Sequence, residues 1–347
     1  MSADAPALVE APPGFPPLEE LRAGVLAGDR IMLARAITLV ESRHPAHRRA
    51  AEALLESLLA HAGTAHRIGI SGVPGVGKST LIEALGLKLL DAGHRVMVLA
   101  IDPSSELSGG AILGDKTRMT RLAAADGAFV RPTASAGRLG GVAAATRDVI
   151  LLGEAAGFDR IIVETVGTGQ SETEVADLVD SFLLLLLPSA GDELQGIKKG
   201  VMERADIFVI NKADRHPEAA KTAARDVRAA LRILRAGARD GWMPPVLTCS
   251  ALTGEGLDDV IAALARHRAW LDQSGEGEAR RRAQRRRWLK EAIAEALAEL
   301  WDRDPDLAAE RARLEQEVLA GRLLPRRAAR ELVERRLGSP GEKARDG

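Results

Sequence analysis

The sequence predicts an α/β protein in which a mostly parallel central sheet is flanked by helices. Two observations lead to this expectation. Short apolar runs alternate with segments of helical periodicity between residues 65 and 272, which is the pattern of repeated strand–helix–strand units. Near the start of this region, a glycine-rich loop at residues 72–79 joins an apolar run to a helical segment. A region of this kind and length accommodates about seven strands with helices on both faces.

The composition of the chain limits which partners and which cellular location are expected. The chain has 347 residues with 48 Lys and Arg, 49 Asp and Glu and a net charge of −1, so no global basic field favours a nucleic-acid partner. The single cysteine, Cys249, excludes an internal disulfide and fits a reducing, cytoplasmic location. Residues 1–17 lack a leader pattern, and the most apolar run, residues 182–187, is too short to span a membrane.

Helical periodicity also predicts structure on either side of the α/β region. Leucines and isoleucines recur at helical spacing before residue 65, and Gly275 and Gly277 form a hinge before a second helical stretch. Trp270, Trp288 and Trp301 are candidate anchors of a subunit interface. The expected segments are a disordered N-terminus (1–16), an N-terminal helical cap (17–64), the α/β domain (65–272), a C-terminal helical dimerisation arm (276–337) and a tail (338–347).

The glycine-rich loop fits the Gly-x4-Gly-Lys-Ser phosphate-binding pattern. Its strand–loop–helix context is what the chemistry requires, because glycines let backbone N–H groups approach phosphates and the helix N-terminus adds partial positive charge. We expect Lys78 to reach the β- and γ-phosphates and the Ser79 hydroxyl to bind Mg²⁺. The predicted phosphate site comprises Gly75, Val76, Gly77, Lys78, Ser79 and Thr80.

A second motif, Asn211-Lys212-Ala213-Asp214, follows the apolar run at residues 206–210. Ligands of open α/β sheets bind at the carboxyl ends of strands. The Asp214 carboxylate can accept hydrogen bonds from N1–H and the 2-amino group of guanine, a pair that adenine does not offer. Ser250-Ala251 ends a later apolar run, and in P-loop GTPases such a pair supplies a backbone N–H to the guanine oxygen. Together with the phosphate loop, these elements predict a GTP-binding protein.

Two carboxylates are expected near the phosphates. Asp102 and Glu164 each follow an apolar strand, and Mg²⁺ accepts one or two carboxylates beside Ser79 and phosphate oxygens. The predicted catalytic set is completed by Lys78 and by Gly167, whose N–H can contact the γ-phosphate. Thr168 stands where small signalling GTPases have a water-orienting glutamine, so we expect slow intrinsic hydrolysis unless a partner completes the site.

Four segments together resemble MeaB, the family of methylmalonyl-CoA mutase-associated GTPases, which is grouped with the metallochaperone-like P-loop GTPases. The resemblance extends from Pro17 to Leu337, and the last segment has no counterpart in the general P-loop pattern. The segments are Asp102-Pro103-Ser104-Ser105, residues 109–119 (GGAILGDKTRM), residues 164–172 (ETVGTGQSE) and residues 191–200 (GDELQGIKKG).

The resemblance implies a homodimeric GTPase that binds the adenosylcobalamin-dependent mutase, gates cofactor loading and protects the mutase from inactivation, without holding cobalamin tightly itself. The balanced charge and the short apolar runs, not the resemblance, are the reasons for expecting no nucleic-acid and no membrane partner. By position the resemblance makes Asp115 a metal and switch carboxylate together with Asp102 and Glu164. It also places a further switch, which relays the nucleotide state to the partner, at Asp192, Gln195 and Lys198.

Other functions are less consistent with the residues. A nickel-insertion GTPase, the alternative we retain, should have a histidine-rich tract or a cysteine–histidine site, but the seven histidines are scattered. A protein-targeting GTPase would need a methionine-rich module, which this sequence does not suggest. A small-substrate kinase would not need the guanine-reading loop that this sequence has. The arginines at 280–282 and 285–287 suggest a charged helix face or a dimer arm more than a nucleic-acid site, because few aromatic residues accompany them.

Overall fold

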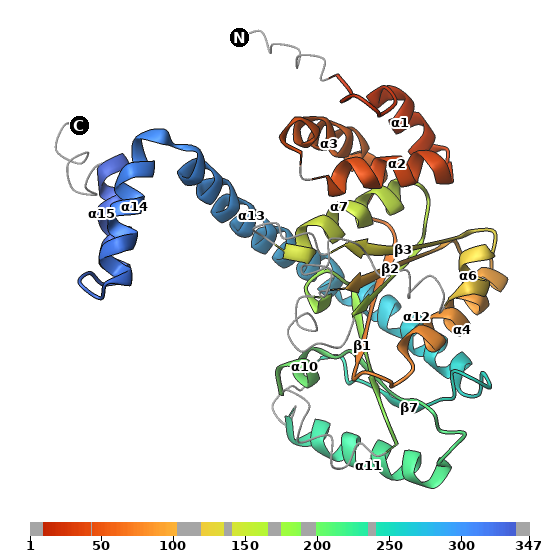
Figure 1. Cartoon of the computed structure of the whole chain (residues 1–347). Helices are drawn as coiled ribbons and strands as arrows, with labels where there is room; N and C mark the ends of the chain where they lie inside the picture. The colour runs from red at the N-terminus through yellow and green to blue at the C-terminus, as the bar shows by residue number, and fades with distance from the viewer. Residues whose placement is uncertain are drawn as a thin grey trace. The chain divides into compact units, whose positions relative to one another are not determined.

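The computed structural model describes residues 10–42, 44–102, 119–134, 141–165, 175–188, 199–234 and 241–337 (Figure 1). It divides into two compact units, residues 1–285 and residues 286–347. The first unit contains the sheet and the N-terminal helices, and the second contains helices only. The first three turns of the helix that follows Gly275 thus belong to the sheet-containing unit.

Seven strands form one sheet in the order β3-β2-β4-β1-β5-β6-β7, and all of their pairings are parallel. This confirms the predicted fold class. β1 lies between β4 and β5, so the loop that follows it opens where the strand order reverses, the usual place for a ligand in such sheets. The strands are β1 (His66–Gly72), β2 (Val96–Asp102), β3 (Ala128–Ala134), β4 (Arg160–Thr165), β5 (Ser181–Leu186), β6 (Ile207–Ile210) and β7 (Val246–Thr248).

The strands are apolar on both sides because helices cover both faces of the sheet. Every residue of β5 is buried, and its leucines are part of the core. β3 was not foreseen as a separate strand because Pro132 interrupts its pattern. It is an edge strand, where one side has no ladder partner and a missing N–H is tolerated. β7 is shorter than expected and ends at Thr248, before the Ser250-Ala251 pair.

One face of the sheet is covered by α4 and α12, whose Leu81, Leu85 and Val260 pack with Ile68 and Ile70 of β1. The other face is covered by α7, where Gly153 lies against Met97 and Ile161. The helices of the α/β region are α4 (Lys78–Asp91), α6 (Thr120–Ala124), α7 (Gly141–Ala155), α10 (Lys199–Arg204), α11 (Pro217–Leu234) and α12 (Leu257–Ser274).

The predicted N-terminal cap consists of α1 (Leu18–Leu26), α2 (Arg30–Glu41) and α3 (Pro45–Leu58), followed by a short 3-10 turn (Leu59–His61). The three helices pack on one another and on α7 (Figure 1). The Asp29 carboxylate caps α2 by accepting from the N–H groups of Ile31 at 2.7 Å and Met32 at 3.0 Å. The cap is therefore part of the sheet-containing unit, seated over α7.

The second unit contains the later part of α13 (Glu276–Arg303), followed by α14 (Pro305–Leu319) and α15 (Pro325–Leu337). α14 and α15 pack together through buried Leu307, Leu314 and Ala328. Four large apolar residues of α13 are 51–68% exposed: Leu289, Ile293, Leu297 and Leu300. In the described part of the chain, no helix combines the length and the apolar character needed to cross a membrane.

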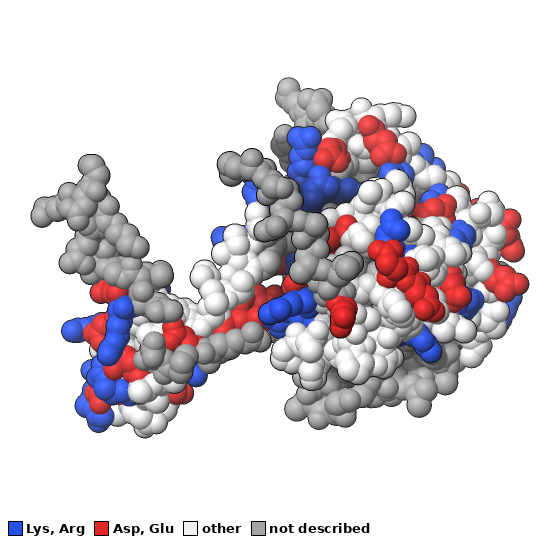
Figure 2. Space-filling model, turned by 90° about the horizontal axis from the view of Figure 1, so that it is seen from above, with Lys and Arg blue, Asp and Glu red and all other residues white. Residues whose placement is uncertain are grey.

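Acidic and basic side chains are intermixed on the face that Figure 2 shows. This agrees with the net charge of −1 and with the expectation that no single-sign field dominates the protein.

Candidate nucleotide-binding site

The phosphate loop lies between β1 and α4, as the sequence predicts. Gly77 precedes the first residue of α4 with φ 98°, in the left-handed region that favours glycine. A Cβ atom at this position would lie 2.6 Å from Nδ2 of Asn211, so both the backbone conformation and the close approach require glycine. Ser79 and Thr80 lie in the first turn of α4, where backbone N–H groups lack intrahelical partners and can bind an anion.

Lys78 is largely buried, and its ammonium group lies over the loop. Nζ donates to the carbonyl oxygens of Gly72 at 2.8 Å and Val73 at 3.3 Å. A phosphate oxygen is a charged acceptor and forms a stronger hydrogen bond with an ammonium group than a carbonyl does. The position of Lys78 therefore suits a role in binding phosphate at this loop.

Ser79 and Glu164 meet at the same place. The Ser79 hydroxyl donates to Oε1 of Glu164 at 2.9 Å, and Glu164 is only 5% exposed. A hydroxyl and a buried carboxylate beside a phosphate loop provide the oxygen ligands that Mg²⁺ prefers, so these residues fit that ion. Asp102 ends β2, the neighbour of β4, which brings its backbone to the same edge of the sheet.

Asn211 connects the phosphate loop to both predicted base-reading segments. Its side-chain amide, on a residue only 1% exposed, donates from Nδ2 to the Val76 carbonyl at 2.8 Å. Oδ1 accepts from the Ala251 N–H at 3.0 Å and from the Cys249 thiol at 3.5 Å. The motif predicts Asn211 as a site residue, but it does not predict this three-way link, because the link joins residues far apart in the sequence.

Lys212 forms the next contact with the phosphate loop. Its φ of 60° is the only positive value of a non-glycine residue in the described regions, and such a conformation costs about 1–3 kcal/mol unless its surroundings hold it. Nζ of Lys212 donates to the Gly75 carbonyl at 2.6 Å, and the Ala213 N–H donates to the Cys249 carbonyl at 3.0 Å. These contacts fix the loop so that exposed Asp214 follows at the edge of the site.

The loop after β7 is held by its own hydrogen bonds. The Ser250 hydroxyl accepts from the Thr253 N–H at 3.1 Å, and the Ser250 carbonyl accepts from the Gly254 N–H at 2.9 Å. We expected the Ser250-Ala251 pair to supply a backbone N–H to the guanine oxygen, and in the structure the Ala251 N–H donates to Asn211. Its contact with the base stays a prediction.

Cys249 is a buried and unreactive thiol. Burial, followed by the negative charge of Asp214, raises its pKa to about 12, so it stays protonated at neutral pH. In the described regions no cluster of three or more His, Cys, Asp or Glu side chains is arranged to hold a metal ion.

Several predicted residues lie outside the described residues. These are Gly167, Asp115, Asp192, Gln195, Lys198 and the side chain of Asp102. The structure thus brings together Lys78, Ser79 and Glu164 at the phosphate side and Asn211, Lys212 and Ala251 at the base side.

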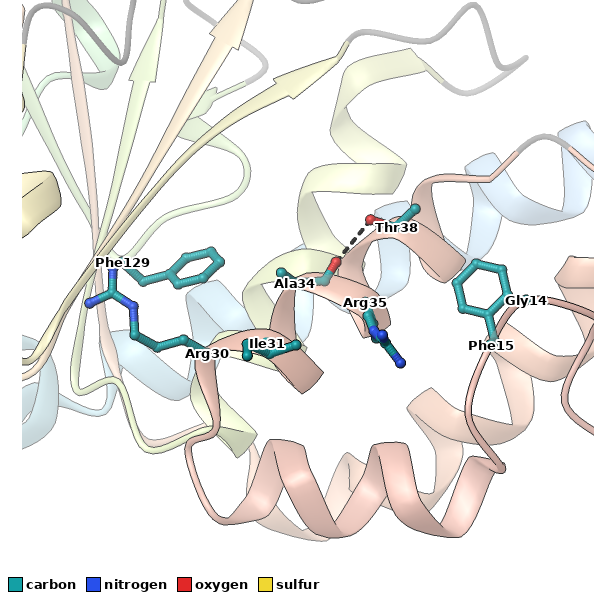
Figure 3. A pocket seen from close by; sticks show the side chains of 8 residues that line it. All are labelled: Gly14, Phe15, Arg30, Ile31, Ala34, Arg35, Thr38 and Phe129. Atoms are coloured by element: carbon teal, nitrogen blue, oxygen red, sulfur yellow. Dashed lines mark hydrogen bonds between the residues drawn. The ribbon is translucent and has the colours of Figure 1, made fainter.

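A pocket of about 490 Å³ opens elsewhere, between α2 and the edge strand β3. Figure 3 shows Ile31 and Arg35 on α2, with Phe129 at one end of the pocket and Phe15 at the other. None of the predicted nucleotide-site residues lines this pocket. It is therefore distinct from the nucleotide site.

A second polar cluster lies at the opposite edge of the sheet, where the strands begin. The Ser181 hydroxyl is 2.7 Å from Nε2 of His66 and 2.7 Å from Nδ1 of His267, and all three residues are buried. Burial is the main cause that lowers the pKa of His66 to about 3 and that of His267 to about 4, so both are neutral at pH 7.

Two residues of the arginine cluster extend this network. Arg280 pairs with Asp206 through hydrogen bonds of 2.9 and 3.0 Å, and Arg281 pairs with Asp180 through hydrogen bonds of 2.8 and 2.6 Å. Both arginines therefore anchor the start of α13 to the sheet. The prediction of a charged helix face fits exposed residues of this cluster such as Arg282. This arginine pairs with Glu278 of the same helix at 3.1 Å.

Comparisons with known proteins agree with this geometry. The family model "Methylmalonyl Co-A mutase-associated GTPase MeaB" matches residues 33–306. A probable GTPase of Mycobacterium tuberculosis is 52% identical over 319 residues, which cover 91% of this chain and 94% of that protein. The mouse protein named methylmalonic aciduria type A homolog, mitochondrial, is 43% identical over 323 residues, or 90% of this chain and 78% of that protein.

A solved structure shares the fold across most of both chains. It is a crystal structure of a protein named LAO/AO transport system kinase, with 39% sequence identity and a TM-score of 0.70. The match covers 91% of this chain and 96% of the other.

Proposed function

This chain belongs to the family of methylmalonyl-CoA mutase-associated GTPases, and from that membership we propose that it is a GTP-hydrolysing chaperone of the adenosylcobalamin-dependent mutase. In this proposal it binds the mutase, gates the loading of adenosylcobalamin and protects the mutase from inactivation. The observation that carries the nucleotide part is the Asn211 side chain, which joins the phosphate loop to the base-reading segments. The likeness to the mouse methylmalonic aciduria type A homolog supports the mutase part.

In this proposal, different residues bind different parts of the nucleotide. Loop amides and Lys78 bind the phosphates, and Asp214 selects guanine. Ser79 and Glu164, 2.9 Å apart, would hold Mg²⁺ together with Asp102 and Asp115. The ion, when bound, neutralises charge on the phosphate oxygens. The Gly167 N–H would then contact the γ-phosphate and sense its loss.

Intrinsic hydrolysis is slow in this proposal, because Thr168 cannot orient the attacking water as a glutamine does. The mutase raises the rate through the segment that holds Asp192, Gln195 and Lys198. The protein acts as a homodimer and does not hold cobalamin tightly. The exposed apolar residues of α13 support the dimer, since neighbouring exposed apolar side chains on one helix are typical of an interface.

The test is GTP turnover of the purified protein, alone and with the methylmalonyl-CoA mutase of its host. We expect a low basal rate that rises many-fold with the mutase. Lys78→Ala should abolish both rates, whereas Lys88→Ala, an exposed lysine of the same helix paired with Asp258 at 2.6 Å, should change neither. Turnover without stimulation and without a complex would refute the mutase part and leave the GTPase part intact.

A further inference from the structure

A hydrogen bond between two hydroxyl groups joins the ends of β1 and β4 beneath the phosphate loop. The Thr165 hydroxyl donates to Oγ of Ser71 at 2.9 Å, and both residues are fully buried. The parallel register pairs Ile70 with Glu164, so the two hydroxyls stand one residue further toward the nucleotide edge of the sheet.

The stability that this hydrogen bond contributes does not by itself explain why two hydroxyl groups lie here. A buried hydroxyl–hydroxyl bond contributes about 1 kcal/mol net, and apolar residues of the same shape can do as well. The neighbours of the pair are more informative. Ser71 precedes Gly72, whose carbonyl accepts from Lys78, and Thr165 follows Glu164, whose carboxylate accepts from Ser79. Each hydroxyl is thus adjacent in the chain to a residue that contacts the phosphate-binding side chains.

We infer that Ser71 and Thr165 are positioning residues for GTP hydrolysis. Their hydrogen bond fixes the phosphate loop against the end of β4, which carries Glu164 and continues toward Gly167. The inference rests on the proposed GTPase function and adds two residues that the phosphate-binding and base-reading motifs do not contain. Because the loop amides and Asp214 bind the nucleotide without this link, its loss affects the transition state more than the binding of GTP.

The test is steady-state GTP hydrolysis by Thr165→Val, which keeps the branched shape and removes the hydroxyl. We expect kcat to fall about tenfold, a loss of about 1.4 kcal/mol in the transition state, while KM for GTP changes by less than about twofold. Thr165→Ser should restore most of the rate because it keeps the donor. Ser71→Ala combined with Thr165→Val should be no slower than Thr165→Val alone, since both remove the same bond.

Thr146→Val is the matched control, because Thr146 is an equally buried threonine in α7. It should lower the melting temperature about as much as Thr165→Val does without changing kcat. If Thr165→Val matches Thr146→Val in kcat while the wild type hydrolyses GTP, the inference is wrong and the proposed function stands. A wild-type protein that hydrolyses no GTP would overturn both.

Discussion

At the residue scale, the recognition of guanine that we propose depends on the exposed Asp214 carboxylate at the end of the Asn211 loop. Asp214→Asn replaces one of two acceptors with a donor. A hydrogen bond to a charged group contributes about 1.5–3 kcal/mol, so we expect GTP affinity to fall about 10- to 100-fold. Xanthosine triphosphate, which has an oxygen in place of the 2-amino group, should bind the variant better than GTP does.

Titration calorimetry with both nucleotides measures this change in preference. Asp226→Asn is a suitable control, because Asp226 is an exposed carboxylate on α11 that belongs to no predicted site. Unchanged GTP affinity in Asp214→Asn would refute the assignment of the base-reading loop.

Gly77 offers a second test of the loop geometry. Gly77 and Gly93 both have positive φ, 98° and 86°, but only at Gly77 would a Cβ meet another residue, at 2.6 Å from Nδ2 of Asn211. Gly93→Ala should cost about 1–2 kcal/mol of stability from backbone strain alone. Gly77→Ala should cost more and should also weaken GTP binding, as measured by urea unfolding and nucleotide titration. Equal effects of the two variants would contradict the contact between the loop and Asn211.

At the element scale, the start of α13 is held to the sheet by paired charges. The side chain of Asp180 is 2% exposed and that of its partner Arg281 is 12% exposed. Although burial works to raise it, the hydrogen bond and charge of Arg281 hold the pKa of Asp180 below its ordinary value. Arg281→Ala would leave this carboxylate buried without its main partner, so we expect a loss of about 3–5 kcal/mol.

The neighbouring Arg282 is the control for this prediction, since its side chain is 75% exposed. Arg282→Ala should change stability by less than about 0.5 kcal/mol. Urea unfolding of the two variants measures the difference. Similar stabilities would mean that the start of α13 is not anchored by this pair.

The histidines of the same network predict how stability depends on pH. The pKa values of His66 and His267 in the folded protein, about 3 and about 4, lie below their ordinary value of 6.5. The unfolded chain therefore binds more protons between these values, and the free energy of unfolding decreases as pH falls from about 6.5 toward 4. Each histidine contributes a slope of up to about 1.4 kcal/mol per pH unit.

Urea unfolding between pH 7.5 and pH 5 tests this dependence. His267→Gln should be less stable at pH 7 but should lose less stability on acidification than the wild type. The charged groups around the pair, Asp180, Asp206, Arg160, Arg268 and Arg280, are the same in the wild type and in His267→Gln, so a difference between the two profiles is assigned to His267. A flat profile in the wild type would contradict the neutral, buried state of both residues.

The same elements show what the sequence can and cannot predict. Apolar runs predicted strands before the glycine-rich loop, before Asp102 and before Glu164, and at residues 182–187 and 206–210, and the structure has β1, β2, β4, β5 and β6 there. These runs are informative because a strand buried on both faces needs nearly every side chain to be apolar. The motifs named Lys78, Ser79 and Asn211, which the structure brings to the same edge of the sheet, and their roles toward the nucleotide stay predictions. The partners of Asn211, Thr165 and Arg281 could not be predicted, because these contacts join residues about 40 to 216 positions apart and no local pattern encodes them. In the sequence, a run of arginines predicts a solvated helix face. Only the fold shows that aspartates lie beside Arg280 and Arg281.

At the scale of the whole molecule, the homodimer we propose depends on the exposed apolar stripe of α13. Leu289, Ile293, Leu297 and Leu300 recur at helical spacing and are 51–68% exposed, so they form one apolar face along the helix. A second copy of the chain would remove this face from water, and a carboxylate in its centre would oppose that burial. We expect Ile293→Asp with Leu297→Asp to convert a dimer into a monomer.

Light scattering coupled to size-exclusion chromatography measures the mass of each form. Leu324→Asp is the matched control, because Leu324 is 73% exposed but lies between α14 and α15, outside the stripe. It should leave the dimer intact. None of these residues belongs to the predicted nucleotide site, so basal GTP turnover should persist in the monomer and show that the variant is folded. A double variant that remains dimeric would place the interface elsewhere, and a monomeric wild type would contradict the proposed homodimer.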